Sequence, residues 1–307
     1  MSDTTITVLG AFMADLVTRT DRMPVWGETM RGNSFAMGPG GKGSNQAVAA
    51  ARQGAQVNLI SRLGQDQFGH MAQQLYADEG LYTRFVTEDA DHPTATASIT
   101  VDDASGENAI ITVPGACEAV TVEDVDRAEV AIAESRVFVS QLELPETACR
   151  YALGVARRAG AAVLLNPAPA LDLPDASFAE VDYLTPNESE AAALVGHPVE
   201  NADQARDAAR ALRERGVTHA LITLGADGVY VSSPDYEGHI PAVDAGPVIE
   251  TTGAGDAFNG ALAAAIAEDR PLAEAVRFAN AAAGLSVTQP GAAHAMPSRA
   301  AVERLLG

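Results

Sequence analysis

The chain has 307 residues, of which 47% are apolar, and a formal net charge of −21. This size and composition predict a globular protein with a large buried core, and the excess of 41 acidic over 20 basic residues argues against nucleic acid as a partner, because its phosphates would be repelled. We expect no membrane span, since the sequence contains no run of 18 apolar residues.

The start of the chain and the cysteines favour a cytoplasmic location. A polar N-terminus leads directly into the strand-like run Ile6–Leu9, without the pattern of a signal peptide. The two cysteines, Cys117 and Cys149, match neither a disulfide framework nor the spacing of a zinc site.

The basic residues comprise 19 arginines and one lysine. An acidic composition nearly free of lysine predicts a halophilic protein from a high-salt cytoplasm, in which the self-repulsion of the acidic surface is screened. The alternative is an ordinary acidic protein from a GC-rich genome, since such genomes also favour arginine over lysine.

Strand-like and helical patterns alternate along the chain. The strand-like runs are Thr5–Leu9, Val57–Ser61, Val137–Ser140, Ala162–Asn166, Tyr183–Thr185 and Ala220–Leu224. The helical patterns are Asn45–Gln53, Phe68–Glu79, Val122–Glu134, Thr147–Ala159, Ala202–Glu214 and Ala257–Ala267. This alternation predicts an α/β fold with a parallel sheet covered by helices on both faces.

Polar residues that follow these strand patterns predict the position of a ligand site. They are Asp15, Glu143, Asn166, Asn187 and Thr223. Because ligands of such sheets bind at the carboxyl ends of the strands, we expect these residues to share one cleft.

Two segments, 15–37 and 94–113, interrupt the alternation with short strand-like pieces and no good helical pattern. In the second segment, Ala97–Val101 and Asn108–Val113 flank the turn Asp102–Glu107, which indicates a β-hairpin.

The only lysine, Lys42, lies in the glycine-rich stretch Gly38–Gln46 at the start of a helical pattern. Glycines let the backbone approach a polar ligand, and the amide of Asn45 can hydrogen-bond sugar hydroxyls. The P-loop spacing is absent, because Gly43 rather than Ser or Thr follows the lysine. We interpret the stretch as a ligand-binding turn, with a surface loop that carries a stray lysine as the alternative.

The stretch Thr251–Gly260 follows a short strand-like run around Val248–Ile249 and begins a helical pattern. Gly253 and Gly255 expose N–H groups at a helix start, where the dipole favours an anion. Asp256 would repel a bound anion, so the arrangement makes sense if Asp256 takes a proton from an attacking hydroxyl while the N–H groups hold the developing charge of a phosphoryl group. A helix cap with tightly packed glycines is the alternative.

These two stretches together resemble the paired signatures of the PfkB carbohydrate kinases, and within that family they are most similar to the ribokinases. The further motifs that match in order are Pro24-x-x-Gly27-Glu28-Thr29, Gln141-Leu142-Glu143, Asn166–Ala170, Thr185–Glu190 and Ile222–Gly228. The resemblance runs from about residue 6 to residue 300 and implies one three-layer α/β domain over residues 1–307. Segments 15–37 and 94–113 would form a small β-sheet lid over the sugar, through which two subunits form a homodimer.

The resemblance also implies an activity, the ATP-dependent phosphorylation of the 5-hydroxyl of ribose. Asp256 matches the catalytic base, and Gly253, Ala254 and Gly255 match the anion hole around the transferred phosphate. The positions that match sugar contacts are Met13, Asp15, Gly41, Lys42, Asn45 and Glu143. Met13 stands where many ribokinases have an asparagine.

On the nucleotide side, Asn187 and Glu190 resemble the family's N-x-x-E motif, with Glu190 acting on Mg²⁺ through water. A helix N-terminus with Asn187 as its cap is compatible with that role. The positions that match contacts to ATP are Thr223, Gly225, Gly228 and Asn280.

The family's monovalent-cation site, for K⁺, maps to Glu250, Thr252, Ser286, Gln289, Gly291 and Ala295. Glu250 replaces the usual aspartate, and Ala295 replaces a side-chain oxygen donor. Several ligands of this site are backbone carbonyls, so the site can survive with a changed affinity.

Other functions stay open at this point. The same phosphoryl transfer to ribose 1-phosphate, a nucleoside or another small sugar is one, and Arg31 or Arg84 near the lid could then pair with an anomeric phosphate. A non-catalytic sugar or nucleotide sensor is disfavoured, because a sensor need not keep Asp256 and the anion hole.

Overall fold

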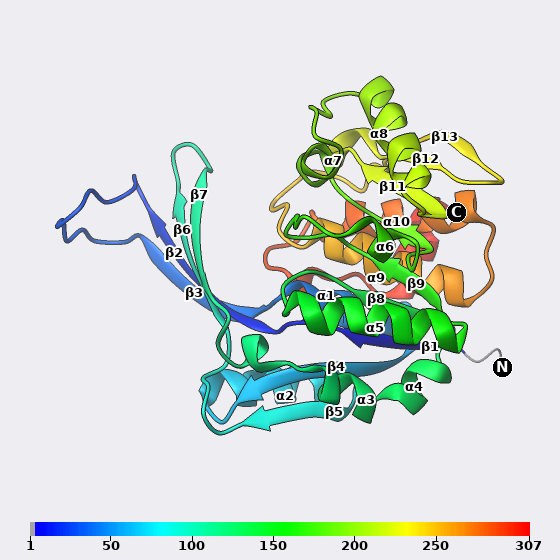
Figure 1. Ribbon diagram of the computed structural model, residues 1–307. Helices are drawn as coiled ribbons and strands as arrows, with labels where there is room; N and C mark the ends of the chain where they lie inside the picture. Colours follow the sequence, from blue (N-terminus) through cyan, green and yellow to red (C-terminus); the bar gives the residue numbers. More distant parts are fainter. Residues whose placement is uncertain (1–3) are drawn as a thin grey trace.

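The computed structural model describes residues 4–307 and contains two β-sheets (Figure 1). The large sheet has nine strands in the order β13-β12-β11-β10-β9-β8-β1-β4-β5. Their bounds are β1 Thr5–Leu9, β4 Gln56–Gly64, β5 Tyr82–Asp89, β8 Val137–Ser140, β9 Ala162–Leu165, β10 Tyr183–Leu184, β11 His219–Thr223, β12 Val229–Ser232 and β13 Glu237–Ile240. The strands from β5 to β11 pair in parallel, whereas β12 and β13 are antiparallel additions at one edge.

Helices cover both faces of the large sheet. On one face pack α1 Lys42–Arg52, α2 Gln67–Asp78, α9 Ala254–Ala267, α10 Leu272–Ser286 and α11 Arg299–Leu306. On the other pack α3 Val122–Arg127, α4 Glu129–Ala133, α5 Glu146–Ala159, α6 Asp175–Phe178, α7 Glu188–Val195 and α8 Ala202–Glu214. The predicted three-layer α/β fold is confirmed.

Continuously buried runs along the central strands contribute to two cores. Val8 and Val139 pack in the core with α1 and α9, whereas Leu9 and Phe138 pack in the core with α5 and α8. Successive side chains of a strand point to opposite faces, so a strand that is apolar at every position must be covered on both. No helix of the described residues 4–307 has the length and apolar character that crossing a bilayer requires.

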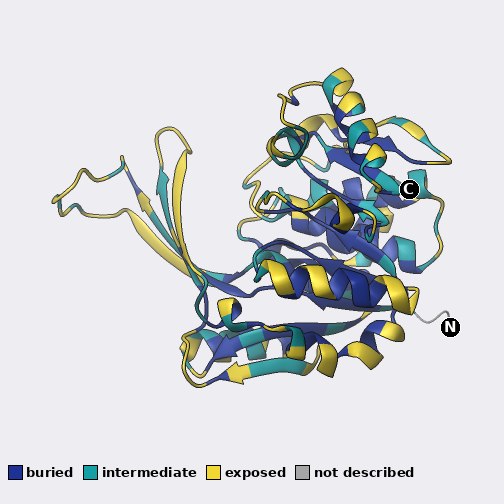
Figure 2. Cartoon of the chain, in the orientation of Figure 1, coloured by how far each residue is buried: buried dark blue, intermediate teal, exposed yellow. Residues whose placement is uncertain are grey.

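The second sheet, called the small sheet below, has the strand order β3-β2-β6-β7. Its strands are β2 Met13–Thr20, β3 Ser34–Gly40, β6 Thr96–Asp102 and β7 Asn108–Val113. The sheet extends away from the body of the molecule, and Figure 2 shows how much of it is exposed. The hairpin predicted across Asp102–Glu107 is confirmed as the antiparallel pair β6–β7.

Two local predictions were wrong. The helix expected over Val122–Glu134 is divided at Ala128, where the chain leaves helical geometry between α3 and α4. Val248–Ile249 forms no strand and is exposed, and Ile249 N donates to Val287 O, which follows α10, rather than to a strand.

The sequence made no prediction for β12 and β13. They pair antiparallel, because β11, β12 and β13 are joined by short turns rather than by crossover helices.

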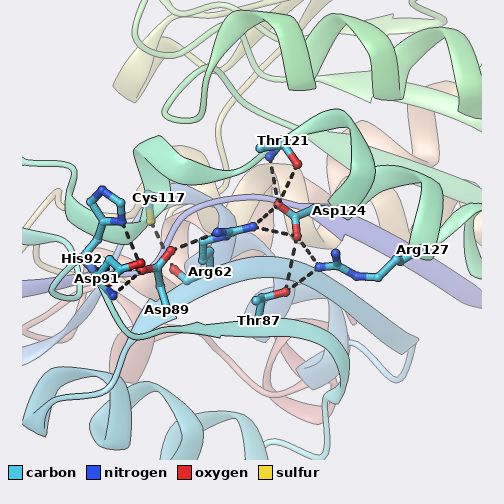
Figure 3. Close-up of polar contacts among 9 residues, drawn as sticks. All are labelled: Arg62, Thr87, Asp89, Asp91, His92, Cys117, Thr121, Asp124 and Arg127. Atoms are coloured by element: carbon cyan, nitrogen blue, oxygen red, sulfur yellow. Dashed lines mark hydrogen bonds and ion pairs between the residues drawn. The ribbon is translucent and has the colours of Figure 1, made fainter.

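A cluster of ion pairs holds the root of the small sheet (Figure 3). Arg62 of β4 donates to Asp89 at the end of β5 at 2.9 Å and to Asp124 of α3 at 2.8 Å. Asp89 also accepts the backbone N–H groups of Asp91 and His92, both at 2.9 Å, in the segment that leads to β6. The guanidinium group of Arg62 thus joins two strands and a helix, and Asp89 extends this cluster to the connection that leads to the small sheet.

Candidate active site

The candidate site is centred on the buried carboxylate of Asp256, in the first turn of α9. Two amides from the start of α1 donate to it: Asn45 Nδ2 to Oδ2 at 2.9 Å and Gln46 Nε2 to Oδ1 at 3.0 Å. The early and the late glycine-rich stretches, more than 200 residues apart, therefore meet at one carboxylate.

Glycines make this meeting of α1 with the large sheet sterically possible. Gly41 precedes α1 with φ +87°, and a Cβ there would lie 2.6 Å from the backbone of Met13. A Cβ on Gly43 would lie 2.3 Å from the Cα of Gly10, which follows β1. Neither position admits a side chain, so α1 begins directly against the carboxyl end of β1.

Four carboxylates and one ammonium interact electrostatically at the site: those of Asp15, Glu143, Glu190 and Asp256, and that of Lys42. The backbone N–H of Lys42 donates to Glu143, after β8, at 2.8 Å. The Asp15 carboxylate packs against Gly40, where a Cβ would lie 2.2 Å from its Oδ2 atom. Asp15 does not follow β1 as predicted, but lies within β2 and so comes from the small sheet.

Burial and mutual repulsion change the acidity of these groups. Burial, together with the charges of Asp256 and Glu250, raises the pKa of Asp15 to about 6. Burial also raises the pKa of Glu143 to about 7, although Lys42 opposes the shift. Burial lowers the pKa of Lys42, but Asp256, Glu143 and Glu190 outweigh it, so its pKa is raised overall and the ammonium keeps its charge.

The start of α9 presents backbone N–H groups next to Asp256. Gly253 caps the helix with φ +80°, and by helix geometry the N–H groups of Gly255 and Asp256 lack intrahelical acceptors. Gly255 is exposed, and no protein atom of the described residues lies within 4 Å of the position that its Cβ would occupy. A ligand can therefore reach the backbone here, where the helix dipole favours an anion.

The residues predicted for the nucleotide lie along the carboxyl ends of β10 and β11. Asn187 caps α7 by accepting from Glu190 N at 2.8 Å, while Glu190 Oε2 accepts from Asn187 N at 2.9 Å. Thr223 pairs with Asn187 through an isolated parallel bridge. The compatible interpretation of Asn187 as a helix cap is confirmed.

The three other positions differ in exposure. Gly225 is exposed, whereas Gly228 is buried, with φ +97°, and a Cβ there would lie 2.3 Å from the carbonyl oxygen of Ile240. Asn280 on α10 is buried and donates to the carbonyls of Ile240 and Pro241 at 3.3 and 2.9 Å. Asn280 and Gly228 thus both support the turn after β13.

The positions predicted for a monovalent cation belong to two neighbouring segments. Glu250 Oε2 accepts from the backbone N–H of Gly291 at 2.9 Å, and Glu250 N donates to Val287 O at 3.2 Å. Ser286 is buried and donates to Ala283 O at 2.8 Å, Ala295 is buried, and Thr252 and Gln289 are exposed. One oxygen of Glu250 is thus already used by the protein.

A set of buried polar residues behind Asp256 received no role from the sequence. Gln46, Gln141, Thr185 and Asn259 all lie within the quoted stretches, but only the structure shows that hydrogen bonds connect them through Asn166. Each of these four side chains is 2% exposed or less. Their burial marks them as a network, and residue spacing in the sequence does not reveal that burial.

A three-layer α/β body, a projecting small sheet and a buried carboxylate beside an open helix N-terminus together define a carbohydrate kinase. The chain belongs to the pfkB family of carbohydrate kinases, whose model matches residues 3–299. The resemblance predicted from the motifs is confirmed.

Named relatives are similar along almost the whole chain. The chain is 39% identical over 295 residues to a ribokinase of Haemophilus influenzae, covering 96% of each protein. It is 36% identical over 294 residues to a deoxyribokinase of Salmonella typhi, covering 95% of each.

Solved structures give the same result for the fold. A ribokinase of Arabidopsis thaliana in complex with ribose and ATP aligns with a TM-score of 0.91 at 29% identity, over 100% of this chain and 99% of that one. A ribokinase of Thermotoga maritima aligns with a TM-score of 0.89 at 33% identity, over 98% and 99%.

Proposed function

We propose that this protein transfers the γ-phosphoryl group of ATP to the 5-hydroxyl of ribose. The observation that carries the proposal is the Asp256 carboxylate, which is fixed by Asn45 and Gln46 and lies at the open N-terminus of α9. Asp256 takes the hydroxyl proton, and the N–H groups at 253–256 hold the charge that develops on the phosphoryl group. A purified-protein assay with ATP and a panel of pentoses, ribose phosphates, nucleosides and hexoses tests it.

The remaining cleft residues bind and orient the two substrates. Asp15, Asn45 and Glu143 offer carboxylate and amide groups to the sugar hydroxyls, and Gly41 and Lys42 bring the start of α1 against them. Thr223, Gly225, Gly228 and Asn280 form the side on which the nucleotide binds. Phosphoryl transfer depends chiefly on such positioning and charge neutralisation.

Two ions belong to the proposal. Glu190 would act on Mg²⁺ through water, which suits a carboxylate that already caps α7 with one oxygen. K⁺ would lie between the segments of Glu250 and Gly291, held by backbone carbonyls and the free oxygen of Glu250. The substitutions at Glu250 and Ala295 give this site a changed affinity.

We predict that 2-deoxyribose is a much poorer substrate than ribose, with the loss mainly in kcat/KM. A site whose buried polar groups bind a hydroxyl leaves those groups unpaired when the hydroxyl is missing, which costs ~1–3 kcal/mol or about 5- to 150-fold. Parallel kcat/KM measurements with both sugars check this.

A second acceptor, 2-deoxyribose itself, is favoured by one observation. Met13 is buried at the start of β2. Its thioether has no N–H or O–H group, so it cannot donate a hydrogen bond to a sugar hydroxyl. A kcat/KM for 2-deoxyribose equal to or above that for ribose would overturn the ribose assignment and leave the phosphoryl transfer intact. Ribose and ribose 1-phosphate are distinguished by supplying both at equal low concentration and comparing their kcat/KM values. A much higher value for ribose 1-phosphate would likewise overturn the ribose assignment.

We also propose that the small sheet, with segments 15–37 and 94–113, is a lid of the same domain and the contact of a homodimer. Its exposed apolar side chains support this: Phe35, Met37, Ile110, Ile111 and Val113 are each more than half exposed. Exposed apolar side chains on the two edge strands of a projecting sheet favour association with a second copy. Sedimentation equilibrium over a range of concentrations distinguishes a dimer from a monomer.

Halophily predicts a strong dependence of stability on salt. With a net charge of −21, we expect the melting temperature to fall as KCl drops from molar concentration to below about 0.1 M, where the Debye length reaches ~10 Å and repulsion is poorly screened. Thermal melts in KCl and in NaCl separate general screening from an effect of the cation site. A melting temperature that stays flat over this range contradicts the prediction.

A further inference from the structure

Gln46 uses all of its side-chain hydrogen-bonding groups inside the protein. Its Nε2 donates to Asp256 Oδ1 at 3.0 Å and to Asn166 Oδ1 at 3.1 Å, and its Oε1 accepts from Gln141 Nε2 at 2.7 Å. The residue is fully buried. Because an ionised carboxylate only accepts hydrogen bonds, the amide of Gln46 must turn its N–H groups toward Asp256, and its Oε1 then faces Gln141 Nε2.

The backbone around Gln141 is shaped to admit this contact. Gln141 follows β8 and is 2% exposed. A Cβ on Gly10 would lie 2.6 Å from Gln141 Oε1, so a side chain at position 10 would push the amide away from Gln46.

The same network reaches the backbone of α9 beside Asp256. Asn166 donates to Thr185 O at 3.0 Å, Thr185 Oγ1 donates to Asn259 Oδ1 at 2.6 Å, and Asn259 Nδ2 donates to Gly255 O at 2.8 Å. Both the carboxylate of Asp256 and the peptide that precedes it are therefore fixed by buried amides.

We propose that Gln46, held by Gln141 and Asn166, is a positioning residue for Asp256. It fixes the plane of the carboxylate and keeps it ionised, so that the carboxylate can accept a hydroxyl proton. This inference rests on the proposed function, in which Asp256 is the base. Asn45 differs from Gln46, because its Oδ1 atom has no hydrogen-bond partner among the described residues and its amide can turn toward a substrate.

Several charged groups act on Asp256, and they set the sign of the expected effect. Lys42 of α1 favours its ionised form, whereas Asp15 of β2, Glu143 after β8 and Glu190 of α7 disfavour it. Burial raises the pKa of Asp256, and Lys42 and the amides of Asn45 and Gln46 oppose that rise. Removing the Gln46 donor therefore raises the pKa further, and the acid limb of kcat moves to higher pH.

The test is Gln46→Met, which keeps the length of the side chain and removes its polar atoms. We expect kcat on the plateau to fall ~10-fold and the acid limb to move up by about one pH unit, with a change in KM for the sugar below ~3-fold. Gln141→Met, which frees the amide of Gln46, should give the same changes at smaller size and decides the matter if Gln46→Met fails to fold.

Gln53→Met is the matched control. Gln53 follows the last residue of α1 and is 1% exposed. Its side chain donates to Pro297 O at 2.8 Å, away from Asp256. It should lower the melting temperature without moving the acid limb. If Gln46→Met also lowers only the melting temperature, the network is structural and the proposal fails. Loss of turnover in Asp256→Asn with a normal pH profile in Gln46→Met would remove this inference alone, whereas full turnover in Asp256→Asn would remove the base itself.

Discussion

Replacing Asp256 by asparagine is expected to lower kcat by at least ~10²-fold, about 2.7 kcal/mol of transition-state stabilisation, and to leave the fold nearly intact. The carboxamide has the same shape as the carboxylate but cannot take a proton from the sugar hydroxyl. Single-turnover kinetics with ATP and ribose measure the loss, and ATP binding by calorimetry should change little.

The structure explains why this variant should fold. The new amide nitrogen would face a donor from Asn45 or from Gln46. The Asn45 amide can turn to accept it, because its Oδ1 atom has no partner among residues 4–307. Asp182→Asn is a suitable control. Asp182 lies at the amino end of β10, whereas Asp256 lies at the carboxyl ends of the strands, and it accepts from Arg157 and from Val163 N. Wild-type turnover in Asp256→Asn would exclude Asp256 as the base.

Replacing Arg62 by methionine should destabilise the protein by about 3 kcal/mol, because it leaves two largely buried carboxylates without their shared guanidinium group. The side chains of Asp89 and Asp124 are 7% and 2% exposed. For a chain of 307 residues the melting temperature should fall by roughly 5 °C. Differential scanning calorimetry at neutral pH measures the change.

Arg127→Met is the matched control for this prediction. Arg127 pairs with the same carboxylate, Asp124, but its side chain is 53% exposed, so its removal should cost less than ~1 kcal/mol. Equal destabilisation by the two variants would contradict the role assigned to Arg62.

The acid dependence of this pair of variants has a definite sign. Hydrogen bonds from Arg62 and from the backbone hold the pKa of Asp89 below its ordinary value, and Arg62 contributes to the same shift at Asp124 against the effect of burial. A carboxylate with a lowered pKa stabilises the fold above its unfolded pKa of about 4 and loses that contribution as the pH falls further. In Arg62→Met the unpaired carboxylates protonate more easily. The difference in free energy of unfolding between wild type and variant should therefore narrow as the pH falls from 7 to 4.

Much of the fold follows from local patterns that the sequence carries by itself. The β1, β8 and α8 boundaries agree with the predicted ranges, because β1 and β8 are short apolar runs and α8 has a helical apolar pattern with Asn201 as its cap. The glycine-rich stretches around Lys42 and Asp256, together with the other motifs in order, were sufficient to indicate the family.

The tertiary structure alone decided which side chains meet and how they are charged. Asp15 reaches the site from the small sheet. Gln46 connects Asp256 to Gln141 through hydrogen bonds between residues 210 and 95 apart in the chain. Arg62 joins Asp89 to Asp124 across three elements, although nothing near it in the sequence marks it. Burial and long-range contact set these properties, because the pKa of a carboxylate and the orientation of an amide depend on neighbours in space rather than on neighbours in the chain.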